Sequence, residues 1–326
     1  MTPSVQAAAL ILALVVAASA GPWMLRHAAP ALMRTPRLAV GLLLGSIVAW
    51  ILALLAVGPM LAWIVTGPAV LSGGSAQVCQ RCLAAASPST APLFETIVPI
   101  VALLALPAVV AAFLASSTMA EALRRRRATL RTARRLRARS TFRVLYGHHV
   151  LVTDDPHPFA LTLPRRHGGI VISTGALDLL ADDETAAVLA HEHAHLHQRH
   201  HLITAVVTSL TRRLRWVPLL AAAADALGHY LEIAADDAAR HRLGTPALAS
   251  ALLTLAQDSH PAHQQEALDG ALHAHGPDRV RHLTQPRSGT AGVIYTTATA
   301  ACLIALAFLS FTVHVPYALA ALTGCV

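Results

Sequence analysis

Four long apolar runs dominate the pattern of hydrophobic and polar positions along this 326-residue chain. An α-helix needs roughly 20 consecutive apolar residues to cross a bilayer. The runs reach or exceed this length, and they lie at residues 4–25, 38–66, 93–118 and 291–316. The pattern therefore predicts a multi-pass α-helical membrane protein.

The region between the third and fourth runs is polar, rich in His and Arg, and long enough to bury a core of its own. We expect three transmembrane helices within residues 1–119, with an external loop at 67–92. A water-facing domain should occupy residues 120–290, followed by the fourth transmembrane helix and a short external tail at 291–326.

The first apolar run carries Ala18-Ser19-Ala20, which resembles a signal-peptidase site. A secretory leader begins with basic residues, whereas no basic residue precedes Arg26. We therefore expect this segment to be retained as a transmembrane helix.

Within the polar region, β-branched and aromatic residues predict several short strands, broken by Gly and Pro. The expected strands are residues 141–146, 149–152, 159–163 and 169–173. A short helix at 176–180 precedes a helix at 183–200, for which Asp182 is the expected N-cap. A helical hairpin at 202–227, another helix at 229–243 and a weakly ordered connector at 260–282 should follow. A small sheet beside helices is an α+β arrangement.

Composition agrees with a membrane protein, because 55% of the residues are hydrophobic and 13% are charged. All of the basic side chains other than His are Arg, and their placement predicts the orientation. Arg81 alone lies between the second and third runs, whereas nine arginines lie at residues 124–139, directly after the third run. Positive charge gathers on the cytoplasmic side. We therefore expect the N-terminus outside and the domain at 120–290 in the cytoplasm.

The net charge of +8 does not by itself indicate a nucleic-acid partner. The arginine run lacks interleaved aromatic residues for base stacking and follows a transmembrane helix. We interpret it as a topology determinant that contacts anionic lipid, so the bilayer is an expected partner and nucleic acid is not. Of the four cysteines, Cys79 and Cys82 fall in the external loop, where either a disulfide or free thiols are compatible with the spacing.

Candidate chemistry centres on His191-Glu192-x-x-His195 within the helix expected at 183–200. Residues four apart share one helix face, so both imidazoles can bind one Zn²⁺ ion, and Glu192 can act as the catalytic base. A peptidase zinc needs a third protein ligand and an open position for water. We expect His193, His197, His200 and His201 to face solvent or the membrane surface.

Three candidates exist for the third ligand. The first is His201, which has the metzincin spacing, but Gln198 occupies the position where that signature needs glycine. The second is Leu268-Asp269-Gly270, which resembles a motif that site-two proteases place within a membrane helix, but its neighbours here are polar. Glu232, on a separate helix, is the most consistent choice, with Asp236 one turn later as the acceptor for a ligand histidine.

Together, the apolar runs, Leu189-Ala190-His191-Glu192-His193-Ala194-His195 and Glu232-x-x-x-Asp236 resemble the membrane gluzincins. The BlaR/MecR-type antirepressor metallopeptidases are the most similar family, and the HtpX and CAAX-protease group comes second. The resemblance implies a zincin-like domain, one Zn²⁺ per chain and endopeptidase activity facing the cytoplasm at the cell membrane. It also implies a protein substrate such as a winged-helix transcriptional repressor in a signalling pathway.

The β-lactam sensors of that family carry a penicillin-binding domain after the last span, whereas this sequence ends about ten residues after the fourth run. Direct β-lactam sensing is therefore not expected. Two other functions remain open: a quality-control protease of the HtpX type, and a non-catalytic membrane receptor or scaffold with a basic cytoplasmic face. The strand at 169–173 is the expected site for substrate strand addition, and His229, Tyr230 and Arg240 are candidates for stabilising the oxyanion.

Overall fold

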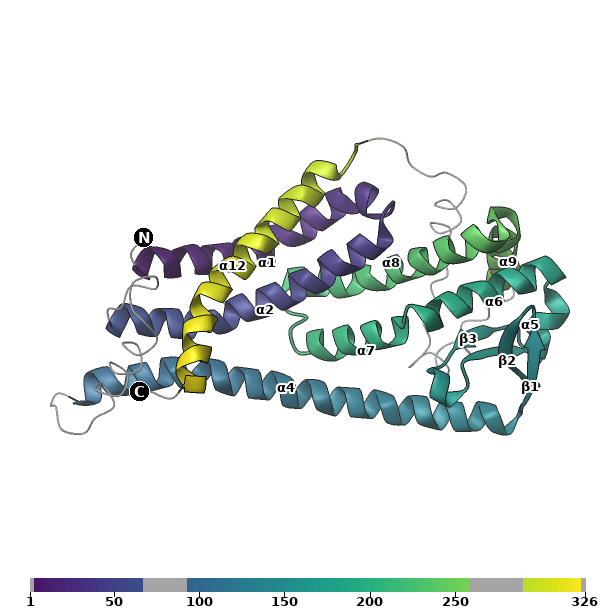
Figure 1. The fold of residues 1–326 in the computed structure, drawn as a ribbon, viewed down its shortest axis with the longest axis horizontal. Helices are drawn as coiled ribbons and strands as arrows, with labels where there is room; N and C mark the ends of the chain where they lie inside the picture. Colours follow the sequence, from purple (N-terminus) through teal and green to yellow (C-terminus); the bar gives the residue numbers. More distant parts are fainter. Residues whose placement is uncertain (1–2, 67–92, 258–289, 324–326) are drawn as a thin grey trace.

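The computed structural model describes residues 3–66, 93–257 and 290–323. Long helices gather at one end of the molecule and a small sheet lies at the other (Figure 1). The loop expected at 67–92, with Cys79 and Cys82, and the connector expected at 260–282 lie outside the described residues.

Within the described residues, four helices are long and apolar enough to cross a membrane. They belong to α1 (Pro3–Leu32), α2 (Pro36–Thr66), α4 (Leu93–Ala138) and α12 (Val293–Thr323). Contacts between α1, α2 and α12 and between α2 and α4 assemble these helices into a bundle. The chain therefore has the helical content expected of a membrane protein.

Helix α4 is a single element of 46 residues. It runs without a break through positions 119 and 120, where the sequence suggested a domain boundary, and carries the arginine run along its second half. The sheet follows directly, because β1 begins two residues after α4 ends. Helix α4 thus connects the bundle to the sheet as one continuous rod (Figure 1).

The sheet is mixed and has four strands in the order β1-β2-β4-β3. Strand β2 pairs antiparallel with β1 and parallel with β4, and β3 pairs antiparallel with β4. Residues Tyr146 and Gly147 form the β1–β2 turn, both with positive φ (50° and 80°), as a two-residue type I′ hairpin requires. The strands are β1 (Ser140–Leu145), β2 (His148–Thr153), β3 (Ala160–Thr162) and β4 (Ile170–Ser173).

Alternating residues of the inner strands face two different helices, as the period of two of a β-strand requires. In β2 and β4, Val150, Val152, Ile170 and Ile172 pack with Val188 and Leu189 of α6 (Asp182–His197). Leu151 and Val171 instead pack with Ala133 of α4. The sheet is therefore enclosed between α4 and α6, and it supports the helix that carries the His-Glu-x-x-His motif.

After α6 come α7 (His200–Thr211), α8 (Pro218–Leu243) and α9 (Thr245–Gln257), and the short α5 (Thr174–Leu179) precedes it. The hairpin expected at 202–227 is present, with α7 and the first part of α8 as its arms, but the expectation of a separate helix at 229–243 is wrong. Proline is tolerated in the first turn of a helix, and Pro218 starts α8, which then continues unbroken to Leu243.

Helix α8 has two different neighbours along its length. Its first half shares a core with α1 and α2, and a Cβ atom at Gly21 of α1 would lie only 2.6 Å from the Leu219 side chain. Its second half carries Glu232 and packs on α6. One continuous helix therefore joins the bundle of candidate membrane helices to the motif helix.

Candidate metal centre

Helix α6 begins one residue earlier than expected, because Ala181 and not Asp182 is its N-cap. The backbone N–H of Ala181 donates to Glu184 Oε2 at 3.0 Å. Asp182, Asp183 and Glu184 place three acidic side chains in the first turn, where they interact favourably with the helix dipole. The local sequence thus fixes the start and phase of the motif helix.

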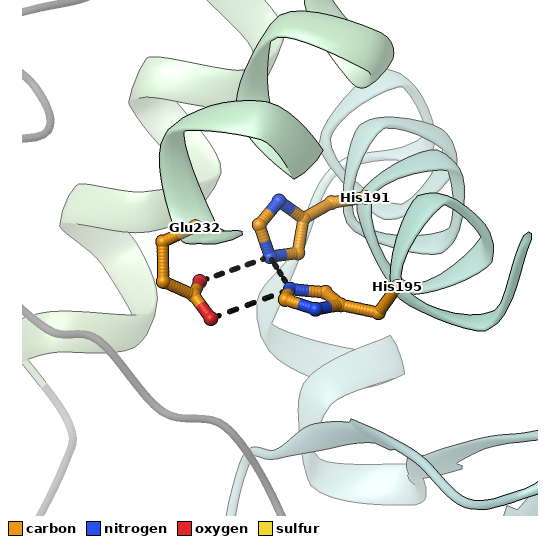
Figure 2. Close-up of side chains that lie close together, drawn as sticks. All are labelled: His191, His195 and Glu232. Atoms are coloured by element: carbon orange, nitrogen blue, oxygen red, sulfur yellow. Dashed lines mark hydrogen bonds and ion pairs between the residues drawn. The ribbon is translucent and has the colours of Figure 1, made fainter. Parts of the chain in front are cut away.

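The imidazoles of His191 and His195 lie together on the buried side of α6. Only 7% of His191 and 4% of His195 is exposed, and their Nε2 atoms face each other at 3.0 Å (Figure 2). The i, i+4 spacing produces this arrangement, as expected from the sequence. Two nitrogens thus converge on one point.

The third group at this point is the carboxylate of Glu232, which arrives from α8. Its Oε2 atom lies 3.4 Å from His191 Nε2, and its Oε1 atom lies 3.4 Å from His195 Nε2 (Figure 2). Glu232 is only 2% exposed. One ligand atom from each of the three residues lies within 4.8 Å of the others.

The geometry and chemistry of this group fit a zinc ion. Ligand atoms about 2.0–2.1 Å from a tetrahedral Zn²⁺ lie about 3.3 Å apart. The observed separations of 3.0 and 3.4 Å bracket that value. Two imidazoles and one carboxylate are also a donor set that catalytic zinc sites use. His191, His195 and Glu232 would hold the ion.

Asp236, one turn after Glu232, approaches the opposite side of the His191 ring. Its Oδ1 atom lies 2.9 Å from His191 Nδ1, and Asp236 is 1% exposed. Accepting the proton on Nδ1 leaves Nε2 available as a metal ligand. Asp236 therefore lies within hydrogen-bonding distance of the His191 nitrogen that faces away from Glu232.

The buried carboxylates of Asp236 and Glu232 strongly favour a positive charge between them. Burial alone would lower the pKa of His191, but its contacts with Asp236 and Glu232 outweigh this effect and raise that pKa to about 10. Burial would raise the pKa of Glu232, whereas His191 and His195 hold it well below its usual range. The site thus attracts a cation, either a proton or a metal ion.

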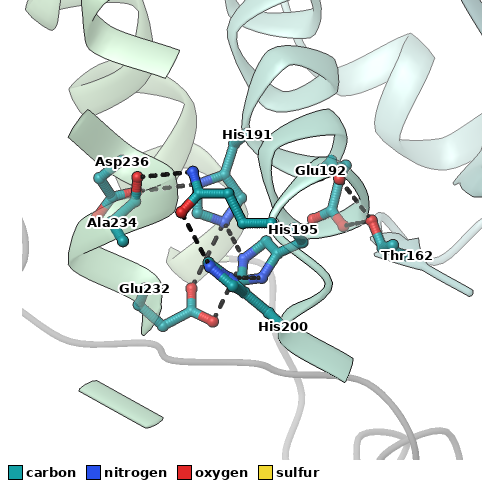
Figure 3. Close-up of polar contacts among 9 residues, drawn as sticks. Thr162, His191, Glu192, His195, His200, Glu232, Ala234 and Asp236 are labelled. Atoms are coloured by element: carbon teal, nitrogen blue, oxygen red, sulfur yellow. Dashed lines mark hydrogen bonds and ion pairs between the residues drawn. The ribbon is translucent and has the colours of Figure 1, made fainter. Parts of the chain in front are cut away.

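His200 is a residue of the site that the sequence did not reveal. It was expected to face solvent or the membrane surface, yet only 2% of it is exposed. Its Nδ1 atom lies 2.9 Å from His195 Nδ1 (Figure 3). Its Nε2 atom lies 3.2 Å from Gln198 Oε1. Because the Gln198 oxygen can only accept, His200 Nε2 must donate there, which leaves His200 Nδ1 to accept from His195.

A turn in left-handed conformation brings His200 back towards α6. Arg199 has φ 55° and ψ 36° and separates α6 from α7. Arginine rarely adopts a left-handed backbone conformation, so the sequence did not indicate a turn at this position. Burial, followed by the neighbouring His195, lowers the pKa of His200 to about 3. His200 is therefore neutral near pH 7, as an acceptor at Nδ1 must be.

Glu192 lies on the other side of α6 from Glu232 and contacts the sheet (Figure 3). Its Oε2 atom is 2.7 Å from the hydroxyl oxygen of Thr162 in β3, and its backbone carbonyl oxygen is 2.8 Å from the same hydroxyl. One hydroxyl proton can serve only one of these acceptors at a time. Thr162 is thus a second residue that the sequence did not single out, and it links the expected base to the edge of the sheet.

The remaining candidates stand apart from the group of three. His201 does not belong to the group that can hold a metal, and Asp269 lies outside the described residues. Among the candidates for oxyanion stabilisation, Tyr230 packs in the core shared with α1 and α2, and Arg240 pairs with Asp237 at 2.9 Å. The left-handed turn at Arg199 brings His200 into contact with His195, but His200 is not part of the group of three.

The expectation that the strand at 169–173 accepts substrate is wrong. Strand β4 is paired on both sides, with β2 and with β3. The strand at the edge of the sheet next to α6 is β3, which contacts the motif helix. Any strand addition beside the motif would therefore involve β3.

Comparison with known proteins gives one family and one relative. Residues 120–286, about half of the chain, match the model of peptidase family M48. An 80-residue segment is 25% identical to a protein described as a protease HtpX homolog from Thermodesulfovibrio yellowstonii. This segment covers 24% of the chain and 28% of that relative, so it spans under a third of the relative's length. No solved structure matches.

Proposed function

This chain belongs to peptidase family M48, and we propose that it is a membrane-embedded, zinc-dependent endopeptidase that cleaves proteins on the cytoplasmic side of the cell membrane. The observation that carries the proposal is the buried convergence of His191, His195 and Glu232 from two helices. Burying three such groups together is costly unless they serve a common cation.

When bound, a zinc ion supplies Lewis-acid polarisation of a carbonyl group and lowers the pKa of water to about 7. Glu192 is the residue that accepts a proton from the attacking water and passes it to the leaving amine. Thr162 holds the Glu192 carboxylate through its hydroxyl group. Asp236 and His200 orient the two histidine rings from behind.

The substrate backbone would pair with the outer edge of β3. Ser173 N–H donates to Phe159 O at 3.0 Å, and Leu163 N–H donates to Gly169 O at 2.8 Å, so alternate residues of this segment bond to β4. The backbone groups of Ala160 and Thr162 then point to the opposite side, away from β4. An extended peptide can bond to them, next to Glu192.

The distribution of arginine supports a cytoplasmic site. Arginines are concentrated in the second half of α4, which leads directly into the sheet. Positive charge at one end of a transmembrane helix favours the cytoplasmic side. The peptidase region at that end of α4 would then meet cytoplasmic proteins and the cytoplasmic parts of membrane proteins.

Two substrate classes follow from the two families that the sequence resembles. One is a soluble winged-helix repressor, cleaved when a signal is received. The other is a range of damaged membrane proteins, and the similarity to a protein described as a protease HtpX homolog favours this class.

Substrate trapping tests the function and separates the two classes. We expect Glu192→Gln to bind zinc and retain substrate without cleaving it, whereas the wild type cleaves it. A single soluble protein in the trap supports the repressor class, and many membrane proteins support quality control. Full proteolytic activity of Glu192→Gln would overturn the assignment of Glu192. A protein purified without zinc would favour a non-catalytic receptor or scaffold.

A further inference from the structure

A buried carboxylate on α4 gathers three arginines where the membrane bundle meets the peptidase region. Glu121 is 4% exposed. Its Oε2 atom lies 2.7 Å from Arg124 and 2.6 Å from Arg212 of the α7–α8 turn, and its Oε1 atom lies 3.1 Å from Arg125. We call these four residues the arginine cluster.

The arginine cluster has a net charge of +2, from three guanidinium groups and one carboxylate. The side chains of Arg124 and Arg212 remain 59% and 52% exposed, whereas that of Glu121 is 6% exposed. A guanidinium group has five N–H donors, and Glu121 uses only part of this capacity. The cluster therefore presents fixed, unsatisfied cationic donors to its surroundings.

An apolar groove of about 330 Å³ lies beside the arginine cluster. It lies between α2, α4 and the end of α7, and its wall includes Ile51, Leu55, Leu114, Ala115, Thr118 and Leu210. It reaches Ala122 on α4 and Leu210 on α7, adjacent in sequence to Glu121 and two residues before Arg212. The groove thus runs along the candidate membrane helices and ends at the positive charge.

The residues around the arginine cluster are of the types that lie at the level of the lipid headgroups in membrane proteins. Helix α7 runs alongside the middle of α4, and the α7–α8 turn lies next to the bundle (Figure 1). That turn exposes 74% of Trp216. Exposed tryptophan and arginine together are typical of the membrane–water interface.

We propose that the groove and the arginine cluster form a binding site for one anionic phospholipid of the cytoplasmic leaflet. An acyl chain fills the apolar groove, and the phosphate binds the exposed donors of Arg124, Arg125 and Arg212. Guanidinium groups suit phosphate because they can form two parallel hydrogen bonds with it. Such a lipid would bridge α4 and α7, and α7 leads through Arg199 to the metal centre.

Lipid binding to the full-length protein in detergent, measured by native mass spectrometry, tests the proposal. We expect one phosphatidylglycerol per chain to bind at least tenfold more tightly than phosphatidylcholine. The triple variant Arg124→Gln/Arg125→Gln/Arg212→Gln should lose this preference. Its matched control, Arg131→Gln/Arg134→Gln/Arg137→Gln, removes the same charge farther along α4 and should keep it.

A second pair of variants leaves the arginine cluster intact. Ala115→Phe fills the groove and should weaken phosphatidylglycerol binding at least tenfold, whereas Ala112→Phe, an exposed alanine outside the groove, should not. Equal binding of the two lipids by the wild type would overturn the proposal, and so would equal losses in both triple variants. Displacement of the lipid by inorganic phosphate alone would also overturn it, because the acyl chain would then contribute nothing. The zinc content of every variant should stay unchanged, so failure here leaves the peptidase proposal standing.

Discussion

The Nδ1 atoms of His195 and His200 lie 2.9 Å apart in a buried contact, so one ring must donate and the other must accept. Gln198 Oε1 accepts from the far side of His200, which makes His195 the donor. In the neutral form of His195 the single ring proton then lies on Nδ1, which leaves Nε2 free to bind metal. His191 is oriented in a similar way, because Asp236 lies beside its Nδ1 atom and leaves its Nε2 atom facing the other two ligands.

His200 should therefore matter for metal affinity although it is not a ligand. We expect His200→Ala to weaken zinc binding by about 10–100-fold, because the tautomer of His195 is no longer fixed. Competition with a chromophoric chelator measures the affinity. His193→Ala is the matched control, because the His193 ring contacts His148 of β2 and does not belong to the group of three, and it should bind zinc like the wild type. If both variants bind zinc equally well, the role assigned to His200 is wrong.

Thr162 should influence turnover but not metal content. A hydrogen bond to a charged group contributes about 1.5–3 kcal/mol, so losing it in Thr162→Val should reduce kcat by roughly tenfold or more. Thr162→Ser keeps the hydroxyl group and should retain most of the activity. Both variants should bind one zinc ion. Unchanged kcat in Thr162→Val would show that Thr162 does not position Glu192.

Zinc binding should release a proton near neutral pH. The pKa of His191 is raised from 6.5 to about 10 in the metal-free protein, so His191 is protonated at pH 7.5. The metal needs the neutral ring, and about one proton should therefore go to the buffer. Titration calorimetry in two buffers of different ionisation enthalpy measures this number. A result near zero would mean that His191 is neutral before zinc binds.

The same raised pKa predicts how the stability of the metal-free protein depends on pH. A pKa that is higher in the folded state stabilises the fold fully below the unfolded value, here 6.5, and the benefit is lost as the pH rises towards 10. Thermal unfolding of the metal-free protein should show this decline, and His191→Gln should lack it. An equal decline in both proteins would assign the effect to other groups.

The orientation can be tested with a single introduced cysteine. The chain has four natural cysteines, which are first replaced by serine. Asp183→Cys, in the exposed first turn of α6, should then react with a membrane-impermeant maleimide in inverted vesicles but not in intact cells. Labelling in intact cells would put the peptidase region outside the cell.

Part of this site could be predicted from spacing. Intervals of four residues put His191 with His195, and Glu232 with Asp236, on one face of each helix. That these two faces meet is a tertiary contact, and the sequence left Glu232 as one of three candidates for the third ligand. His200 could not be predicted, because it depends on the left-handed backbone of Arg199, a conformation that arginine rarely adopts. Thr162 depends on how β3 packs against α6, which is a tertiary contact between distant residues.

The helices show the same division. The candidate membrane helices and the strands could be predicted from the pattern of apolar and polar residues. The continuity of α8 through residues 227–229 could not, because Gly228 has a low helix propensity. Leu227 and Tyr230 pack in the hydrophobic core that α8 shares with α1 and α2, and this packing holds that segment helical. Likewise, the sequence did not show that β4 is paired on both sides, which leaves it no free edge for a substrate strand.

Metal analysis of the purified full-length protein tests the central claim most directly. Elemental analysis should find about one zinc ion per chain in the wild type, as expected for a site with three protein ligands. Glu232→Ala should lose most of that zinc, whereas His201→Ala should keep it. Absence of zinc from the wild type, or zinc lost from His201→Ala but kept by Glu232→Ala, would contradict the site described.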